Sequence, residues 1–189
     1  MLVVVLVAAV AVGAVGWSWV RKPLPETSGE LTLPGLTGRV TVLRDDQGVP
    51  QIYADNAQDL FRAQGYVHAQ DRFFEMDLRR HVTAGRLAEL VGPAGVESDV
   101  VVRTLGWRRV AEQELPLLAP ATRQYLQAYA DGVNAYLHAA STPSNVSLEY
   151  SLLDLRYPAA TIEDWTPVDS LAWLKAMAWD LKSDYSGEL

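Results

Sequence analysis

Residues 65–77 read GYVHAQDRFFEMD and lie within a helical pattern that runs from about Asn56 to His81. The apolar residues of this pattern recur at spacings of three, four or seven, so they share one face of a helix. They are Leu60, Val67, Phe74 and Leu78. Asp55 or Asn56 can cap the start of the helix, and Gly85 can end it. The sequence therefore predicts one long amphipathic helix as the central element of the fold.

Shorter patterns flank this helix on both sides. Residues 39–44 and 49–54 are two short β-prone runs, and the turn-forming sequence DDQG joins them, so we expect a β-hairpin. Residues 121–139 carry an apolar and aromatic stripe at helical spacing. A third helix is expected from residues 166–169, TPVD, which combine a capping box with a proline at the first helical position. The predicted fold class is α+β, mainly helical with a short β-hairpin.

Composition excludes several classes of function. The chain has 189 residues, 23 acidic against 16 basic side chains, and a net charge of −7. This length suits one domain, and an acidic chain has no basic surface for holding nucleic acid. There is no cysteine, which excludes disulfides, a cysteine-ligated zinc and a thiol nucleophile.

The first 20 residues carry no charged side chain, and Arg21 and Lys22 follow them. A helix of about 20 apolar residues matches the hydrocarbon thickness of a bilayer, so we predict a retained transmembrane anchor at residues 1–20. A cleavable signal peptide is the competing interpretation. Residues 21–35 are rich in proline, glycine and serine and are predicted to be a linker, and residues 36–189 the folded domain.

The chain taken alone offers no complete active site. It has three histidines, none in a two-histidine metal-binding spacing, and no serine in a G-x-S-x-G turn. His68 could act as a general base, but a helix histidine paired with Asp71, Arg72 or backbone is the simpler interpretation. The charged cluster that contains Asp71, Arg72, Glu75 and Arg79 has the spacing of an ion-pair lattice.

A series of motifs resembles the penicillin acylase family. In order along the chain they are residues 46–54 (DQGVPQIYA), 65–77, 85–90 (GRLAEL), 129–136 (YADGVNAY) and 165–170 (WTPVDS). The resemblance implies an N-terminal-nucleophile hydrolase whose precursor cuts itself into a small α and a large β chain. The new N-terminal serine of the β chain then attacks the amide carbonyl, and its own α-amino group serves as base.

The present chain looks like the α chain of that family, which implies that it holds no catalytic residue of its own. The resemblance further implies that it completes an αββα sandwich with the β chain. An N-acyl amide, as a small molecule or a lipid, is the implied substrate. Two rivals stay open, namely a non-catalytic, membrane-tethered assembly subunit that retains the α-chain fold and a stand-alone membrane-anchored binding domain.

The resemblance also points to particular residues. Glu188 matches by position a glutamate that ligates a structural calcium ion shared with the β chain. Asp184 and Glu188 would by composition alone be a solvated pair, since calcium takes six to eight oxygen ligands. Met177 and Leu181 occupy roughly the places of side chains that line the acyl pocket, and helix core is their alternative role.

The predicted location is the cell membrane, crossed once by residues 1–20, with the folded domain on the extracytoplasmic side. Exported relatives favour that orientation. Arg21 and Lys22 favour the opposite one, because basic residues collect on the cytoplasmic side of a span.

Overall fold

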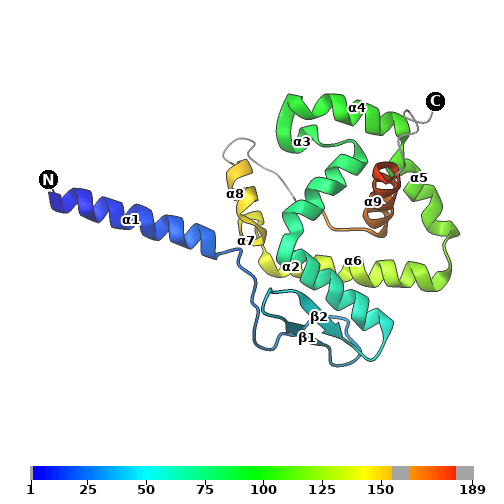
Figure 1. Ribbon diagram of the computed structural model, residues 1–189, viewed down its shortest axis with the longest axis horizontal. Helices are drawn as coiled ribbons and strands as arrows, with labels where there is room; N and C mark the ends of the chain where they lie inside the picture. The colour runs from blue at the N-terminus through cyan, green and yellow to red at the C-terminus, as the bar shows by residue number, and fades with distance from the viewer. Residues whose placement is uncertain (1, 155–161, 182–189) are drawn as a thin grey trace.

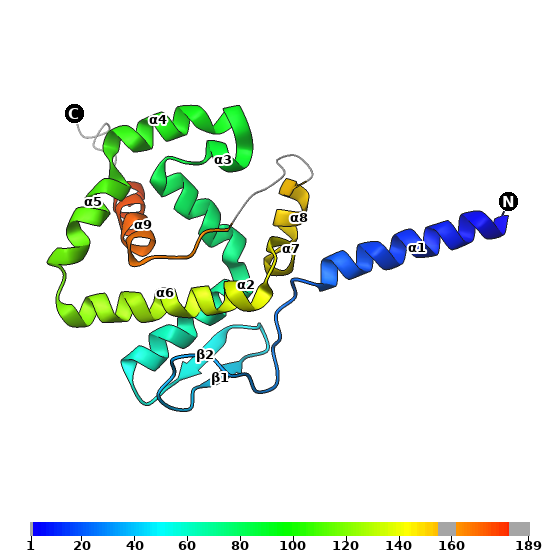
Figure 2. The same cartoon turned by 180° about the vertical axis from the view of Figure 1, so that it is seen from behind.

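The structure is a computed structural model that describes residues 2–154 and 162–181 (Figure 1). Helix α1 extends away from a helical body, and the β-hairpin lies beside the N-terminal half of α2 (Figures 1 and 2). The elements are α1 (Leu2–Arg21), β1 (Thr41–Arg44), β2 (Pro50–Tyr53), α2 (Ala57–Ala84), α3 (Ala88–Val91), η1 (Gly92–Gly95), α4 (Val96–Leu105), α5 (Trp107–Glu114), η2 (Leu115–Leu117), α6 (Pro120–Ala140), α7 (Pro143–Val146), α8 (Leu148–Asp154) and α9 (Pro167–Asp180). The described part of the chain is therefore mainly helical with a two-stranded antiparallel hairpin, as the sequence predicts.

Helix α2 is the predicted central helix, and its ends are set by the expected caps. The side chain of Asn56 accepts a hydrogen bond from the Asp59 amide at 2.8 Å. Gly85 ends the helix in the left-handed region at φ 66°, where a residue without Cβ is favoured. The helix is bent at Arg72, whose φ and ψ of −156° and 38° are not helical.

Helices α2 and α6 cross at unusually close range because each has a glycine at the contact. A Cβ added to Gly65 would lie 2.1 Å from the Tyr129 carbonyl oxygen. A Cβ added to Gly132 would lie 1.9 Å from the Arg62 carbonyl oxygen. The glycine spacing therefore fixes where along their lengths the two long helices meet.

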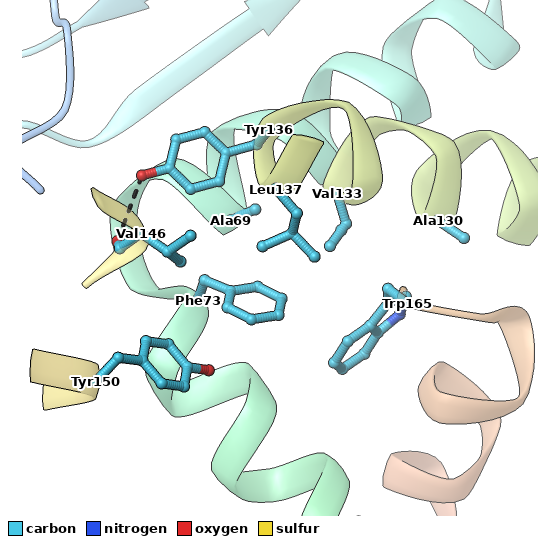
Figure 3. Close-up of a cluster of buried hydrophobic side chains, with 9 residues drawn as sticks. All are labelled: Ala69, Phe73, Ala130, Val133, Tyr136, Leu137, Val146, Tyr150 and Trp165. Carbon is cyan, nitrogen blue, oxygen red and sulfur yellow. Dashed lines mark hydrogen bonds between the residues drawn. The ribbon is translucent and has the colours of Figure 1, made fainter. Parts of the chain in front are cut away.

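The main core fills the space beside this crossing (Figure 3). It is built from buried side chains of α2, α6, α7, α8 and the segment before α9. They are Ala69, Phe73, Ala130, Val133, Tyr136, Leu137, Val146, Tyr150 and Trp165. Residues almost 100 positions apart in the sequence thus share one core, which ties the start of α9 to α2 and α6.

The predicted hairpin and the two later predicted helices are confirmed. Strands β1 and β2 pair antiparallel with Thr41 opposite Tyr53 and Arg44 opposite Pro50. Helix α6 extends one residue beyond the predicted 121–139 at each end. Helices α4 and α5 were not predicted.

The prediction of a single-pass membrane protein anchored by residues 1–20 is wrong. Across residues 2–154 and 162–181, no helix is both long and apolar enough to cross a membrane. The assignments to the cell membrane and to a membrane partner fall with this anchor.

Candidate functional site

Helix α9 begins with the predicted capping box. The carboxylate of Asp169 accepts hydrogen bonds from the amide and from the hydroxyl of Thr166, each at 2.7 Å. Pro167 occupies the first helical turn, where a missing N–H costs nothing. Asp169 is buried, and its second oxygen accepts a 2.5 Å hydrogen bond from Arg108 of α5. The start of α9 is therefore fixed both within the helix and from a neighbouring helix.

Further contacts hold α9 inside an arc formed by α2, α4, α5 and α6 (Figures 1 and 2). Asn134 of α6 holds Trp165, two residues before the helix. Its amide nitrogen donates to the Trp165 carbonyl at 3.0 Å, and its side-chain oxygen accepts from the Trp165 amide at 2.7 Å. Lys175 forms an ion pair with Glu114 of α5. Together with Arg108, the side chains of Asn134 and Glu114 therefore fix the direction of α9.

One face of α9 is buried and another is exposed and apolar. Leu171, Ala172 and Ala176 are buried, and the first two pack with Ala111 of α5. Leu174 and Met177 are exposed to 55% and 41%, and Leu181, the residue that follows the helix, to 78%. Their spacing of three and four residues aligns them, and we call them the α9 stripe.

The α9 stripe contains both residues predicted to line an acyl pocket, Met177 and Leu181. Their exposure in the described chain does not fit the alternative role as helix core. Leu174 was not singled out from the sequence, although its spacing to Met177 and Leu181 was a usable signal. The pocket role itself stays a prediction.

His68 is engaged in the contact between α2 and α6. Its Nδ1 lies 3.0 Å from the Tyr129 hydroxyl oxygen, and the two rings meet edge to face. Burial and the nearby Arg72 lower the pKa of His68, while Asp71 opposes them. Burial raises the pKa of Tyr129 to about 12. A neutral histidine and a neutral tyrosine therefore share a hydrogen bond here, which supports the structural interpretation over the general base.

A buried ionic network joins α2 to α8 and to the segment before α9. Asp77 pairs with Arg80 on the same helix, and the Tyr150 hydroxyl donates to Asp77 at 2.6 Å. Arg80 also donates to the carbonyl oxygens of Glu163 and Asp164 at 2.9 and 3.1 Å. The links to Tyr150, Glu163 and Asp164 each span more than 70 residues of sequence, so the network connects distant parts of the fold.

The ion-pair lattice predicted around residues 71–79 is present in part. Glu75 contacts Arg79 at 3.1 Å and Arg72 at 3.8 Å. Asp71 points elsewhere, because Arg44 of β1 approaches it at 2.7 Å and so ties the hairpin to α2. Spacing within the helix does not indicate this long-range pair.

No nucleophile with an adjacent base is visible in the described residues. His68 contacts Tyr129, His81 contacts Asp77, and the Nε2 of His138 lies 2.8 Å from an Asp164 oxygen. Within residues 2–154 and 162–181, no serine or threonine hydroxyl is hydrogen-bonded to a histidine. A serine–histidine catalytic pair is thus absent from this part of the chain.

The predicted metal ligand lies outside the described residues, as does Asp184. Among the residues that are described, no group of three or more His, Asp or Glu side chains could hold a metal ion. Because calcium takes six to eight oxygens, these residues do not form a calcium site by themselves. The assignment of Glu188 to calcium stays a prediction.

A cleft of about 740 Å³ lies away from α9. It is bounded by residues 26–33, strand β1 and the first turns of α2. Its polar lining residues include Gln70, whose amide nitrogen donates to the Glu26 carbonyl at 3.1 Å. The lining residues contain no histidine, and the cleft is a groove between the N-terminal segment and the hairpin.

The described residues thus form a mainly helical chain in which α9 presents a well-anchored, exposed apolar stripe. Comparison with known proteins gives the family. The sequence profile described as penicillin amidase matches residues 39–189. The chain belongs to the penicillin amidase family and fits the family's α chain.

Individual relatives agree with this assignment. The chain is 41% identical over 157 residues to penicillin acylase 2 proenzyme of Pseudomonas sp. (strain SE83), a match that covers 83% of this chain and 19% of that protein. It is 37% identical over 147 residues to acyl-homoserine lactone acylase QuiP of Pseudomonas aeruginosa, covering 78% of this chain and 16% of that protein. The chain thus spans less than a fifth of the length of these two relatives.

A solved structure shares the fold. Thermostable penicillin G acylase from Alcaligenes faecalis superposes with a TM-score of 0.66 at 33% sequence identity. The superposition covers 76% of this chain and 74% of that chain. The mainly helical arrangement described above is therefore that of a penicillin acylase chain.

Proposed function

We propose that this chain is the α subunit of an amide hydrolase that removes the acyl group from an N-acyl amide. The serine nucleophile lies on a separate β chain cut from the same precursor. The observation that carries the proposal is family membership over residues 39–189. Both named relatives are acylases, one of penicillin and one of acyl-homoserine lactones.

The role of a subunit is supported by what the described residues offer. All three histidines are engaged with Tyr129, Asp77 or Asp164, so a base for a serine has to come from elsewhere. The two-stranded hairpin is supported by α2, and an isolated hairpin is marginal in water. A β chain that extends this hairpin into the αββα sandwich would supply both the missing strands and the nucleophile.

The first experiment identifies the partner. The full-length precursor is expressed, and the purified protein is analysed by intact mass and N-terminal sequencing. We expect a second chain several times larger than this one that begins with serine, and its Ser→Ala variant should remain unprocessed and inactive. A partner beginning with a residue other than Ser, Thr or Cys would favour the non-catalytic assembly subunit instead. Recovery of this chain without a partner would contradict the proposal.

In the proposed enzyme, Met177 and Leu181 of the α9 stripe form part of the wall against which the acyl group lies. Each methylene that is buried contributes about 0.8 kcal/mol. The value of kcat/KM should therefore rise with acyl length from acetyl towards dodecanoyl until the pocket is full. Met177→Ala or Leu181→Trp should shift the preferred length.

The matched control is Leu117→Ala, at a leucine that is exposed to 82% and lies outside the α9 stripe. It should leave the length profile of the enzyme unchanged. If kcat/KM did not change with acyl length across the series, the assignment of the acyl pocket to α9 would be wrong. The assignment would also be wrong if neither Met177→Ala nor Leu181→Trp changed the preferred acyl length.

Glu188 is proposed to contribute one carboxylate to a structural calcium ion whose other ligands lie on the β chain. Glu188→Gln should lower the calcium content of the purified two-chain protein and its melting temperature, while the kcat of processed enzyme changes little. Glu149→Gln is a control on the same chain. Calcium content equal to that of the unchanged protein would argue against the assignment.

A further inference from the structure

Helix α4 places a charged side chain beside the apolar Val102 on its buried face and leaves most of its aliphatic side chains exposed. Asp99 points inwards and is buried, and its carboxylate accepts hydrogen bonds from the Leu87 and Ala88 amides at 2.7 and 2.9 Å. Arg103 donates to the Gly85 carbonyl at 2.7 Å. A surface helix usually buries its apolar stripe and exposes its charges. Here charged side chains attach the helix to its own chain.

The outer half of α4 is mostly aliphatic. At 100° per residue, six positions fall within one half of the helix circumference. They are Val96, Glu97, Val100, Val101, Thr104 and Leu105. The four aliphatic members are exposed to 51%, 60%, 53% and 37% in that order along the chain. We call Val96, Val100, Val101 and Leu105 the α4 face.

The α4 face leads towards the α9 stripe. Trp107 is the first residue of α5, one glycine after α4, and its ring centroid lies 6.2 Å from that of Trp179 near the end of α9. Trp179 is two residues beyond Met177 and is itself 44% exposed. The carboxyl end of α4 and the carboxyl end of α9 thus meet at a pair of tryptophans, as their positions in Figure 1 also indicate.

We propose that the α4 face is a docking surface for the β chain, separate from the acyl-binding wall. The inference rests on the proposed function. A serine on the β chain reaches an acyl group that lies against Met177 and Leu181 only if that chain covers the end of α9. The β chain would then also cover the adjoining α4 face. Exposed aliphatic surface of this kind is typical of a protein–protein interface.

The partner surface that fits is apolar and nearly free of charge. Four aliphatic side chains and one threonine require aliphatic or aromatic groups opposite them, and Glu97 is the single ionisable residue among the six outer positions. This composition matches the centre of an interface, where charged residues are depleted. A docked β chain is also consistent with the roles of Asp99 and Arg103, whose side chains bind backbone groups of this chain and leave the outer half of α4 aliphatic.

The test uses the processed two-chain protein, with single cysteines placed in a chain that has none of its own. Val100→Cys and Val101→Cys are treated with a small maleimide, and labelling of this chain is followed by mass spectrometry. We expect labelling at least tenfold slower than that of a free cysteine peptide, and rapid labelling once the chains are separated under mild denaturant. Val102→Cys is the matched control, because Val102 is buried within this chain and should stay protected while the chain remains folded.

Each outcome of the labelling experiment decides a specific point. Labelling of Val100→Cys at the peptide rate in the intact complex would overturn the docking surface while leaving the proposed function in place. Protection in a particle whose mass equals two copies of this chain would replace the β chain by a second copy and overturn the proposal. Absence of any second chain in the intact mass would instead overturn the proposed function.

Discussion

Gly132→Ala is expected to be among the most damaging single substitutions in the chain. The added Cβ would lie 1.9 Å from the Arg62 carbonyl oxygen, inside any tolerable contact. That oxygen belongs to the backbone of α2, so no side-chain rotation relieves the clash. Alanine gains about 1 kcal/mol in helix propensity over glycine. Overpacking lowers the free energy of unfolding by about 1–3 kcal/mol and sometimes more. We expect a loss at the upper end of this range here, because the clash involves backbone at the crossing of the two longest helices of the body.

The measurement for Gly132→Ala is the yield of folded, processed protein together with its melting temperature. We expect a strong loss of both, and Gly65→Ala should behave alike because its Cβ would lie 2.1 Å from the Tyr129 carbonyl oxygen. Gly16→Ala is the matched control, since nothing lies within 4 Å of a Cβ added there. If Gly132→Ala melted at the same temperature as the control, α2 and α6 could move apart without loss of stability, and the close crossing would not be required.

The elements that local chemistry specifies were predictable from the sequence. Asn56 and Gly85 bound α2 as predicted, because a side-chain cap and a left-handed glycine act through neighbouring backbone groups. Thr166 and Asp169 form the predicted capping box at α9. In each case the residues that decide the structure lie within a few positions of one another.

Features that depend on distant parts of the chain were missed. Helix α4 carries most of its apolar residues on the outer face, so the usual pattern of a surface helix does not reveal it. Asp71 pairs with Arg44 and His68 with Tyr129, both across more than 25 residues, where spacing within one helix says nothing. The same limit applies to the site, since the sequence could place Met177 and Leu181 on a helix but not the contacts that fix its direction.

Asp77→Ala is the second substitution with a large expected effect. Asp77 and Arg80 are each exposed to only 3% at the side chain, and Tyr150 donates to the same carboxylate. Removal of the carboxylate leaves a buried guanidinium without its ionic partner, which costs about 3–5 kcal/mol in measured cases. We expect a loss of that size in the free energy of unfolding, measured by denaturant titration of the processed protein.

The control for Asp77→Ala lies two residues away on the same helix. Glu75 pairs with Arg79, and both side chains are about half exposed. Exposed ion pairs contribute about 0–1 kcal/mol, so Glu75→Ala should have a small effect. Equal effects of the two substitutions would mean that the buried network does not tie α2 to α8 more strongly than a solvated pair does.

The pH dependence of a second variant at this position, Asp77→Asn, separates a lost ion pair from simple loss of packing. Burial raises the pKa of Asp77, but hydrogen bonds and charges from His81, Arg80 and Tyr150 outweigh it and hold the pKa below 3.8. Burial lowers the pKa of His81, and the contacts with Asp77 outweigh it and raise the pKa above 6.5. Because the Asp77 pKa is depressed, its contribution to stability is present above pH 3.8 and is lost as the pH falls through the folded pKa. Because the His81 pKa is raised, its contribution is complete below pH 6.5 and is lost as the pH rises through the folded pKa.

Both contributions are therefore complete together between pH 3.8 and pH 6.5. Asp77→Asn keeps the shape of the side chain but removes its charge, so it should reduce the contribution of both groups. The difference in unfolding free energy between the unchanged protein and Asp77→Asn should be largest in this window and should narrow on either side of it. A difference that stays constant from acid to alkaline pH would mean that Asp77 acts through shape alone, since a packing defect does not titrate.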